Sequence, residues 1–125
     1  MANDYQRKIP ISVDCGIHLF MEVMNGKWKI SLIWSIHNGI RRPAEIHRKI
    51  PSASRRVLDT QLNQLLNHGI ISKKIYDQRP LKVEYELTEL GKTLIPVIES
   101  TARWGEEHRD ILEKTIFSDE IRMQI

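Results

Sequence analysis

The sequence predicts a mainly α-helical fold with one small β-hairpin, and three stretches of its 125 residues lead to that prediction. Residues 54–67 repeat leucine at helical spacing and form one apolar stripe. Residues 70–87 contain two strand-like stretches around a turn-forming segment. Residues 88–117 keep a helical period of apolar positions over a long stretch. We therefore expect residues 1–125 to form a single domain.

The N-terminal part is expected to hold an arm and two short helices. Residues 1–12 have no clear period and contain Pro10, which predicts an arm. A first helix over residues 14–24 ends at Asn25-Gly26, and a second over residues 27–38 ends at Gly39. The apolar positions expected to face the core are Ile17, Phe20, Met21, Met24, Trp28, Leu32, Ile33 and Ile36.

Two further helices are expected to form a helix-turn-helix. Residues 40–42 are too short for a helix and are a candidate short strand. Pro43 suits the first turn of a helix that runs to Lys49, because its missing N–H costs nothing there. Ile50-Pro51 ends that helix, and a tight turn leads to Ser54, the expected N-cap of the next.

The helix over residues 54–67 has two unlike faces. Its apolar face consists of Leu58, Leu62, Leu65 and Leu66. Its other face carries Arg55, Arg56, Asp59, Thr60, Asn63 and Asn67. That face is either an ordinary solvated surface or one that reads bases in a DNA major groove. Gly69 is the expected C′ residue.

The stretch after this helix predicts a β-hairpin with a basic tip. Residues 70–76 are rich in β-branched side chains, and residues 77–80 form a turn. Residues 82–87 alternate, with Val83, Tyr85 and Leu87 on one face. A hairpin that follows a helix-turn-helix in this way is a wing, so the sequence predicts a winged helix-turn-helix.

The C-terminal part predicts one long helix over residues 88–117, capped by Thr88 and kinked at Pro96. Its apolar surface exceeds what one small core needs, which favours terminal helices that form a dimer interface. The alternative is that the helix folds back on its own domain. Residues 118–125 are expected to form a tail.

Composition and charge indicate the class of partner. Residues 40–87 hold ten Lys/Arg and five Asp/Glu, a net charge of +5, although the whole chain carries only +3. Such a basic stretch suits a polyanion, although an ordinary solvated surface also explains it. No apolar run is long enough for a membrane span, and the start lacks a signal peptide. A single cysteine fits a reducing compartment, so we expect a cytoplasmic protein.

Motifs for catalysis, metal binding or cofactor binding are absent from the sequence. There is no HExxH, CxxC, Walker or G-x-S-x-G pattern, and the five histidines are scattered over different predicted elements. We therefore expect no enzyme, no metal and no cofactor. Cys15 is the one reactive candidate, because a thiolate is stabilised at a helix start. Its alternative role is that of a small buried hydrophobe.

Taken together, these segments resemble the HxlR-type family, a branch of the MarR-like winged-helix transcription regulators. The resemblance covers about residues 15–105. It is carried by Cys15, Gly26-Lys27-Trp28-Lys29, Arg42, Glu45-Ile46, Ile50-Pro51, residues 54–58, Gln61-Leu62, Leu65, Gly69-Ile70-Ile71, residues 80–91, Leu94, Pro96-Val97 and Trp104-Gly105. Three positions depart from the family pattern: Gly16, where proline is frequent, Pro43, where phenylalanine is usual, and Arg79, where proline is common.

The resemblance implies a bacterial or archaeal homodimeric regulator that binds double-stranded DNA. It implies that residues 54–67 are the recognition helix, that residues 77–82 are the wing tip and that the terminal helices form the dimer. Some family members sense electrophiles or oxidants through the cysteine that Cys15 matches, so Cys15 is the candidate sensor thiol and a small molecule or oxidant the candidate effector. With one cysteine, a protein disulfide here would join two molecules.

The functional hypothesis assigns a role to each candidate residue. Arg55, Arg56, Thr60 and Asn63 are expected to contact bases in the major groove. Arg42, Ser52 and Ser54 are expected to contact phosphates, and Arg79 and Lys82 the flanking backbone or minor groove. Two other hypotheses stay open at this point: a winged-helix module that binds protein instead of DNA, and a small enzyme.

Overall fold

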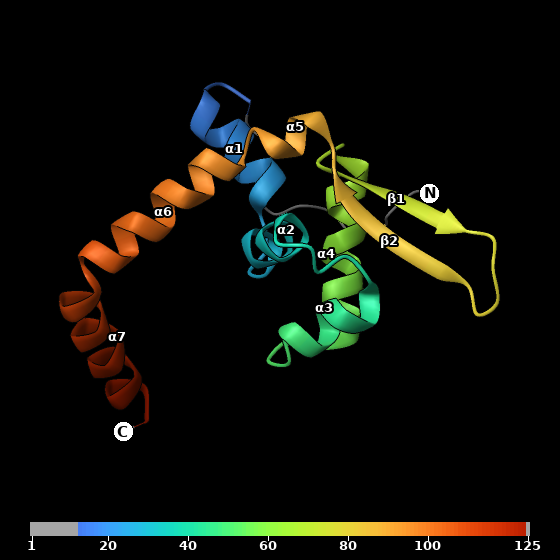
Figure 1. Cartoon of the computed structure of the whole chain (residues 1–125). Helices are drawn as coiled ribbons and strands as arrows, with labels where there is room; N and C mark the ends of the chain where they lie inside the picture. The colour runs from blue at the N-terminus through green and yellow to red at the C-terminus, as the bar shows by residue number, and fades with distance from the viewer. Residues whose placement is uncertain (1–12, 125) are drawn as a thin grey trace, which may run out of the picture.

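The computed structural model describes residues 13–124, which form seven helices and one two-stranded sheet (Figure 1). The first four helices are α1 (Gly16–Met24), α2 (Lys29–His37), α3 (Pro43–Lys49) and α4 (Arg55–Asn67). The strands β1 (Ile71–Tyr76) and β2 (Lys82–Leu87) follow, and then α5 (Glu89–Lys92), α6 (Ile95–Glu107) and α7 (Arg109–Gln124). The predicted winged helix-turn-helix, mainly α with one hairpin, is confirmed. The predicted arm, residues 1–12, lies outside the described residues.

The core lies where α2, α3 and α4 meet. Its most deeply buried apolar side chains, each at most 1% exposed, are Leu32, Ile33, Ile36, Ile46, Leu58, Leu62 and Leu65. Full burial of one such side chain contributes roughly 1.5–3 kcal/mol, so these contacts fix α4 against the other two helices. The leucine stripe of α4 is therefore inward as predicted, with Leu66 only half-buried.

Glycines at the helix ends have two different roles. Gly39 and Gly69 take φ of +92° and +73°, which confirms them as C′ residues. Gly26 also follows a helix end, but it does not take the positive φ that is typical of a C′ glycine. A Cβ there would lie 3.0 Å from Cδ of Gln61 and from Cε of Lys29. Gly26 thus allows the turn between α1 and α2 to approach α4 closely.

The hairpin pairs antiparallel, with Ile71 opposite Leu87 and Tyr76 opposite Lys82. Tyr85 is its buried side chain on β2, and Val83 and Leu87 are half-buried. The candidate strand at residues 40–42 does not form. Its backbone contact with the sheet is a 2.9 Å hydrogen bond from the Tyr85 backbone N–H to the Arg41 carbonyl, and the Arg41 side chain lies 3.9 Å from Oε1 of Glu86. Pro43 starts α3 directly afterwards, which leaves no room for further pairing.

The prediction of one long C-terminal helix is wrong. The structure divides that stretch into α5, α6 and α7. Pro96 stands in the first turn of α6, where its missing N–H costs nothing, so the chain breaks before it instead of kinking at it. A second break lies at His108. The predicted tail, residues 118–125, is helical as far as Gln124. No helix in the described part of the chain is long and apolar enough to cross a membrane.

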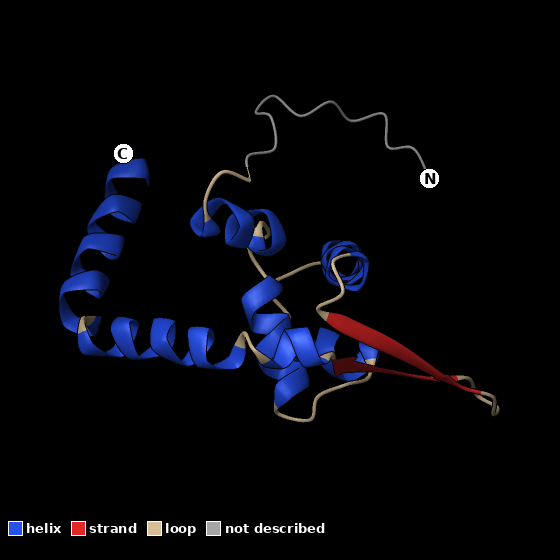
Figure 2. Cartoon of the chain, turned by 90° about the horizontal axis from the view of Figure 1, so that it is seen from above, coloured by secondary structure: helices blue, strands red, loops and turns tan. Residues whose placement is uncertain are grey.

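The helices α6 and α7 extend away from the compact part of the domain, as Figures 1 and 2 show. Only Ile95 and Ile98 of α6 reach the core, and none of the described side chains of α7 is buried. On α1, Ile17 and Met21 were predicted to face the core but are 70% and 58% exposed. Among the residues that the structure describes, none covers that side of α1. The terminal helices therefore carry uncovered apolar surface.

Candidate nucleic-acid interface

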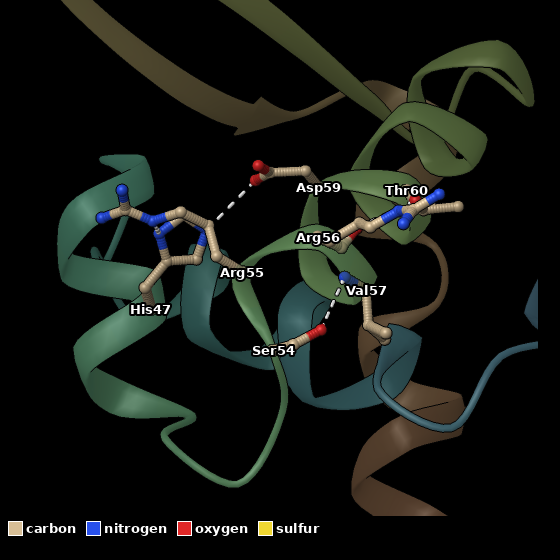
Figure 3. Close-up of polar contacts among 7 residues, drawn as sticks. All are labelled: His47, Ser54, Arg55, Arg56, Val57, Asp59 and Thr60. Atoms are coloured by element: carbon tan, nitrogen blue, oxygen red, sulfur yellow. Dashed lines mark hydrogen bonds and ion pairs between the residues drawn. The ribbon is translucent and has the colours of Figure 1, made fainter.

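The N-terminus of α4 is built by a side-chain cap. Ser54 has extended backbone angles, and its Oγ accepts a 3.1 Å hydrogen bond from the backbone N–H of Val57 (Figure 3). Such a cap stabilises a helix by about 1 kcal/mol. The predicted cap is confirmed. The uncapped backbone N–H groups beside it give this end of the helix a partial positive charge that favours anions.

The polar face of α4 is accessible. Arg55, Arg56, Thr60 and Asn63 are all exposed, as the predicted base-reading surface requires. The Thr60 hydroxyl donates a 2.9 Å hydrogen bond to the Arg56 carbonyl, so it can act toward a ligand only as an acceptor.

The two arginines point in different directions. Arg55 lies beside His47 of α3, whereas Arg56 points away from that pair, toward Thr60 (Figure 3). Arg55 and Asn63 line an open hollow of about 500 Å³ between α3, α4 and the hairpin. Arg56 and Thr60 line a second hollow, of about 330 Å³, that also borders Asn25. The predicted site residues of α4 therefore form two neighbouring clusters instead of one.

Two side chains that sequence reasoning did not assign hold Arg55 in place. The Nε–H group of Arg55 donates to Nδ1 of His47 at 3.1 Å. Nε2 of His47 lies 3.1 Å from Oδ1 of Asp59. No spacing in the sequence indicates this cluster, because His47 lies on α3 and its two partners lie on α4.

Gln61 fixes the opposite side of α4. Its Oε1 accepts a 2.9 Å hydrogen bond from the backbone N–H of Trp28, at the start of α2. This bond and the close approach at Gly26 tie α4 to the turn after α1. The helix is therefore held from α3 on one side and from the α1–α2 turn on the other.

The helix-turn-helix carries two of the predicted phosphate contacts outside α4. Arg42 is the N-cap residue of α3, with a half-exposed side chain whose Nε lies 3.9 Å from Oε1 of Glu45. Ser52 is exposed in the turn between α3 and α4. Both side chains are thus accessible.

The two predicted wing residues differ in exposure and in the contacts that their side chains make. Arg79 is exposed in the turn of the hairpin. Lys82 is only half-exposed, because its Nζ lies 3.3 Å from Oε1 of Glu84 and 4.6 Å from the ring centroid of Tyr76. Hydrogen bonds from Lys82 and Tyr76 lower the pKa of Glu84. Lys82 must therefore exchange existing contacts for any phosphate.

Cys15 is exposed and is the N-cap residue of α1, with no hydrogen bond from its side chain to the helix. The alternative of a small buried hydrophobe is therefore wrong for this chain. The described residues include no group of three or more His, Cys, Asp or Glu side chains that could hold a metal ion.

A helix-turn-helix followed by a β-hairpin, with an exposed arginine-bearing helix face, defines the class of winged helix-turn-helix proteins. The sequence matches the family described as HxlR-like helix-turn-helix over residues 23–113. The chain therefore belongs to the HxlR-like family, as its resemblance indicated.

Its relatives are transcriptional regulators by name. The chain is 40% identical over 104 residues to the uncharacterized HTH-type transcriptional regulator YybR of Bacillus subtilis, with 83% of each chain covered. It is 38% identical over 100 residues to YdeP of the same organism, which covers 80% of this chain and 78% of YdeP. The family match and these relatives identify the chain as a helix-turn-helix transcriptional regulator.

Solved structures give the same result. The redox regulator HypR in its reduced form is 40% identical, with a TM-score of 0.75 over 80% of this chain and 99% of that one. The reduced form of the transcriptional regulator YodB from B. subtilis is 26% identical, with a TM-score of 0.65 over 74% of this chain and 92% of that one. Structures of two regulators with this fold, HypR and YodB, have thus been solved in a reduced form.

Proposed function

We propose that this regulator binds double-stranded DNA as a homodimer, with α4 of each subunit in the major groove and the wing on the flanking backbone or minor groove. The observation that supports this most strongly is the arrangement of α4. Leu58, Leu62 and Leu65 of its apolar face are fully buried, while Arg55 and Arg56 stand exposed at its capped N-terminus. A helix anchored in this way can present side chains to base edges at a fixed angle.

Each exposed side chain has a role that its chemistry allows. Arg55 and Arg56 can each pair bidentately with guanine, and Asn63 with adenine. Thr60 can accept from a base amino group. Ser54 uses an oxygen lone pair for its cap, so its hydroxyl hydrogen is available to a phosphate.

Backbone contacts complete the proposed interface. Arg42 and Ser52 are assigned to phosphates beside the helix-turn-helix, and Arg79 and Lys82 to the strand flanking the groove. Such contacts set the register of the protein on the duplex but do not read its sequence.

The uncovered terminal helices supply the proposed dimer interface. Their exposed large apolar side chains are Ile17, Leu19, Met21, Val97, Trp104, Ile111, Ile116 and Phe117. Burial of these side chains against a second copy would remove them from water. A two-fold dimer would place its recognition helices roughly 34 Å apart, which matches two half-sites one helical turn apart.

Cys15 is the proposed sensor, with an oxidant or electrophile as effector. Two observations support this: the thiol is exposed, and relatives include the redox regulator HypR. A regulator of this kind would act in the cytoplasm, where its DNA lies. No observation favours a protein-binding module without DNA binding or an enzyme, and the named relatives are regulators.

Selection of bound duplexes from a random pool tests the proposal. The expected product is a sequence with two inverted half-sites about 10 base pairs apart, centre to centre. A second selection, after treatment of the protein with a thiol oxidant, is expected to recover fewer duplexes or a different spacing. Failure to enrich any sequence, with untreated protein at moderate salt, would contradict DNA reading and favour the protein-binding module.

A further inference from the structure

His47 lies between two oppositely charged side chains of α4. Arg55 donates from Nε to Nδ1 of the ring, and Oδ1 of Asp59 lies against Nε2, each at 3.1 Å. An arginine Nε–H can only donate, so Nδ1 must carry a lone pair. The ring hydrogen then sits on Nε2 and is donated to the carboxylate. Both contacts are satisfied at once only by the neutral ring in this one tautomer.

The side chain of His47 is held in place by its surroundings. Its side chain is 13% exposed, whereas Arg55 and Asp59 are exposed. The titratable and charged groups that line the same hollow are Arg55 and Asp59 from α4, Lys73 from β1 and Tyr85 from β2. Burial, and secondly the charge of Asp59, raise the pKa of Tyr85, which keeps the phenol protonated. An imidazole is the kind of side chain whose charge ordinarily changes between about pH 5 and 8.

We propose that His47 is a positioning residue for base reading: its neutral ring holds the Arg55 guanidinium in place, and protonation of the ring releases it, so that sequence discrimination at the base read by Arg55 falls with acidification. This inference rests on the proposed function of α4 as a recognition helix. It assigns to that helix a pH-sensitive support from α3 (Figure 3).

Protonation changes the two contacts in opposite directions. A hydrogen on Nδ1 turns the acceptor for Arg55 into a second donor and places an imidazolium beside a guanidinium. The contact to Asp59 becomes a charge-assisted hydrogen bond and is retained. The released arginine keeps its charge, and the ring adds another, so attraction to any duplex does not weaken. Discrimination falls while non-specific affinity holds or rises, which separates this effect from unfolding.

The test compares binding to two duplexes. One is the selected duplex, and the other is altered at a single base pair, the one at which the Arg55→Ala variant loses its sequence preference. Affinity for both is measured by fluorescence anisotropy at about pH 8 and about pH 5.5, on either side of the imidazole range. His47→Gln keeps a neutral acceptor and a neutral donor at both pH values, whereas His47→Leu removes both. His68→Gln, at the exposed C-cap of α4, is the matched control for other histidines. Circular dichroism checks that every variant is folded.

For the wild type and His68→Gln, the discrimination ratio is expected to fall about fivefold or more on acidification, the lower end of what a bidentate arginine pair provides. The discrimination ratio of His47→Gln is expected to be the same at both pH values. The discrimination ratio of His47→Leu is expected to be low at both. An unchanged wild-type ratio, or an equal fall in His47→Gln, would overturn the proposal.

A second measurement does not depend on DNA. Nitrogen NMR shifts of the free protein at about pH 8, where imidazole is ordinarily neutral, are expected to show His47 with its hydrogen on Nε2. A hydrogen on Nδ1 would overturn the support of Arg55 directly. If the tautomer is as expected but no duplex binds at either pH, the proposed function itself fails, and the role of His47 in base reading fails with it.

Discussion

Replacement of Gly91 by alanine is expected to destabilise the joint between the wing and α5. A Cβ on Gly91 would lie 2.1 Å from the carbonyl oxygen of Ile70. Ordinary C···O contacts lie at about 3.3–3.6 Å, so the two segments must separate by about 1 Å. The Ile70 oxygen is a backbone atom that cannot rotate away, and it already accepts hydrogen bonds. The Ile70 carbonyl accepts a 3.1 Å hydrogen bond from the Thr88 backbone N–H. The Thr88 hydroxyl shares its one hydrogen between the carbonyl oxygens of Gly69 at 2.6 Å and Ile70 at 3.0 Å.

The cost follows from the contacts that this separation removes. The two hydrogen bonds that Thr88 donates to this segment, one from its backbone N–H and one from its hydroxyl, contribute about 1 kcal/mol each. The Thr88 cap on the Gly91 N–H, at 3.0 Å, contributes about 1 kcal/mol more. Alanine in a helix returns up to about 1 kcal/mol relative to glycine. The net loss is therefore about 2–3 kcal/mol.

Thermal unfolding followed by circular dichroism measures this loss. For 125 residues, an unfolding entropy of about 2.1 cal/mol/K per residue converts each kcal/mol into about 4 °C. Gly91→Ala should therefore lower Tm by about 8–12 °C at a fixed protein concentration. The matched control is Gly16→Ala at the start of α1, where a Cβ would meet nothing within 4 Å, so its Tm should not fall and should rise by at most about 4 °C. An equally small change for Gly91→Ala would refute the close-approach reasoning.

Four further predictions concern the cap, the wing, a buried charge and the thiol. Ser54→Ala should lower stability by about 1 kcal/mol and weaken duplex binding, and an unchanged Tm would contradict the cap. Lys82→Ala should weaken binding to selected and scrambled duplexes equally and should reduce the salt dependence of binding, measured by titration at several salt concentrations. Burial lowers the pKa of Lys29, which is 2% exposed, although the charge of Glu22 partly opposes this. Between that lowered pKa and 10.5, the unfolded chain therefore binds more protons than the folded chain. Stability should thus rise as pH rises from the lowered pKa toward 10.5, and Lys29→Met should lose this rise in urea unfolding. Oxidant-treated protein should run as a disulfide-linked pair on a non-reducing gel, and Cys15→Ser should not.

Features set by local spacing were predictable from the sequence. The leucines of α4, the Ser54 cap, the left-handed Gly39 and Gly69 and the second strand all lie where periodicity and end signals indicated. These signals depend on neighbours within a few residues, which the sequence displays directly.

Features that join distant segments were not predictable. The pairing of Asp59 and Arg55 with His47 depends on how α3 crosses α4. The burial of Lys29 likewise depends on packing, because its Nζ donates to the carbonyl of Val23 at 3.4 Å while the rest of the side chain is enclosed. Pro96 was misread since an interior proline and a first-turn proline look alike in a periodic stretch. Only the structure distinguishes a kinked helix from two helices.

The most direct test of the claim that the exposed face of α4 reads bases is the binding of Arg55→Ala and Arg56→Ala to the selected duplex and to a scrambled one. Each variant is expected to lose about 1–3 kcal/mol of binding free energy on the selected duplex, which contains the base that the arginine reads. The loss on the scrambled duplex is expected to be much smaller. Lys92→Ala, which removes one positive charge from α5, outside the proposed DNA and dimer surfaces, is the control and should bind both duplexes as the wild type does. Equal losses on the two duplexes, for both arginines of α4, would contradict base reading and leave only electrostatic attachment to the DNA backbone.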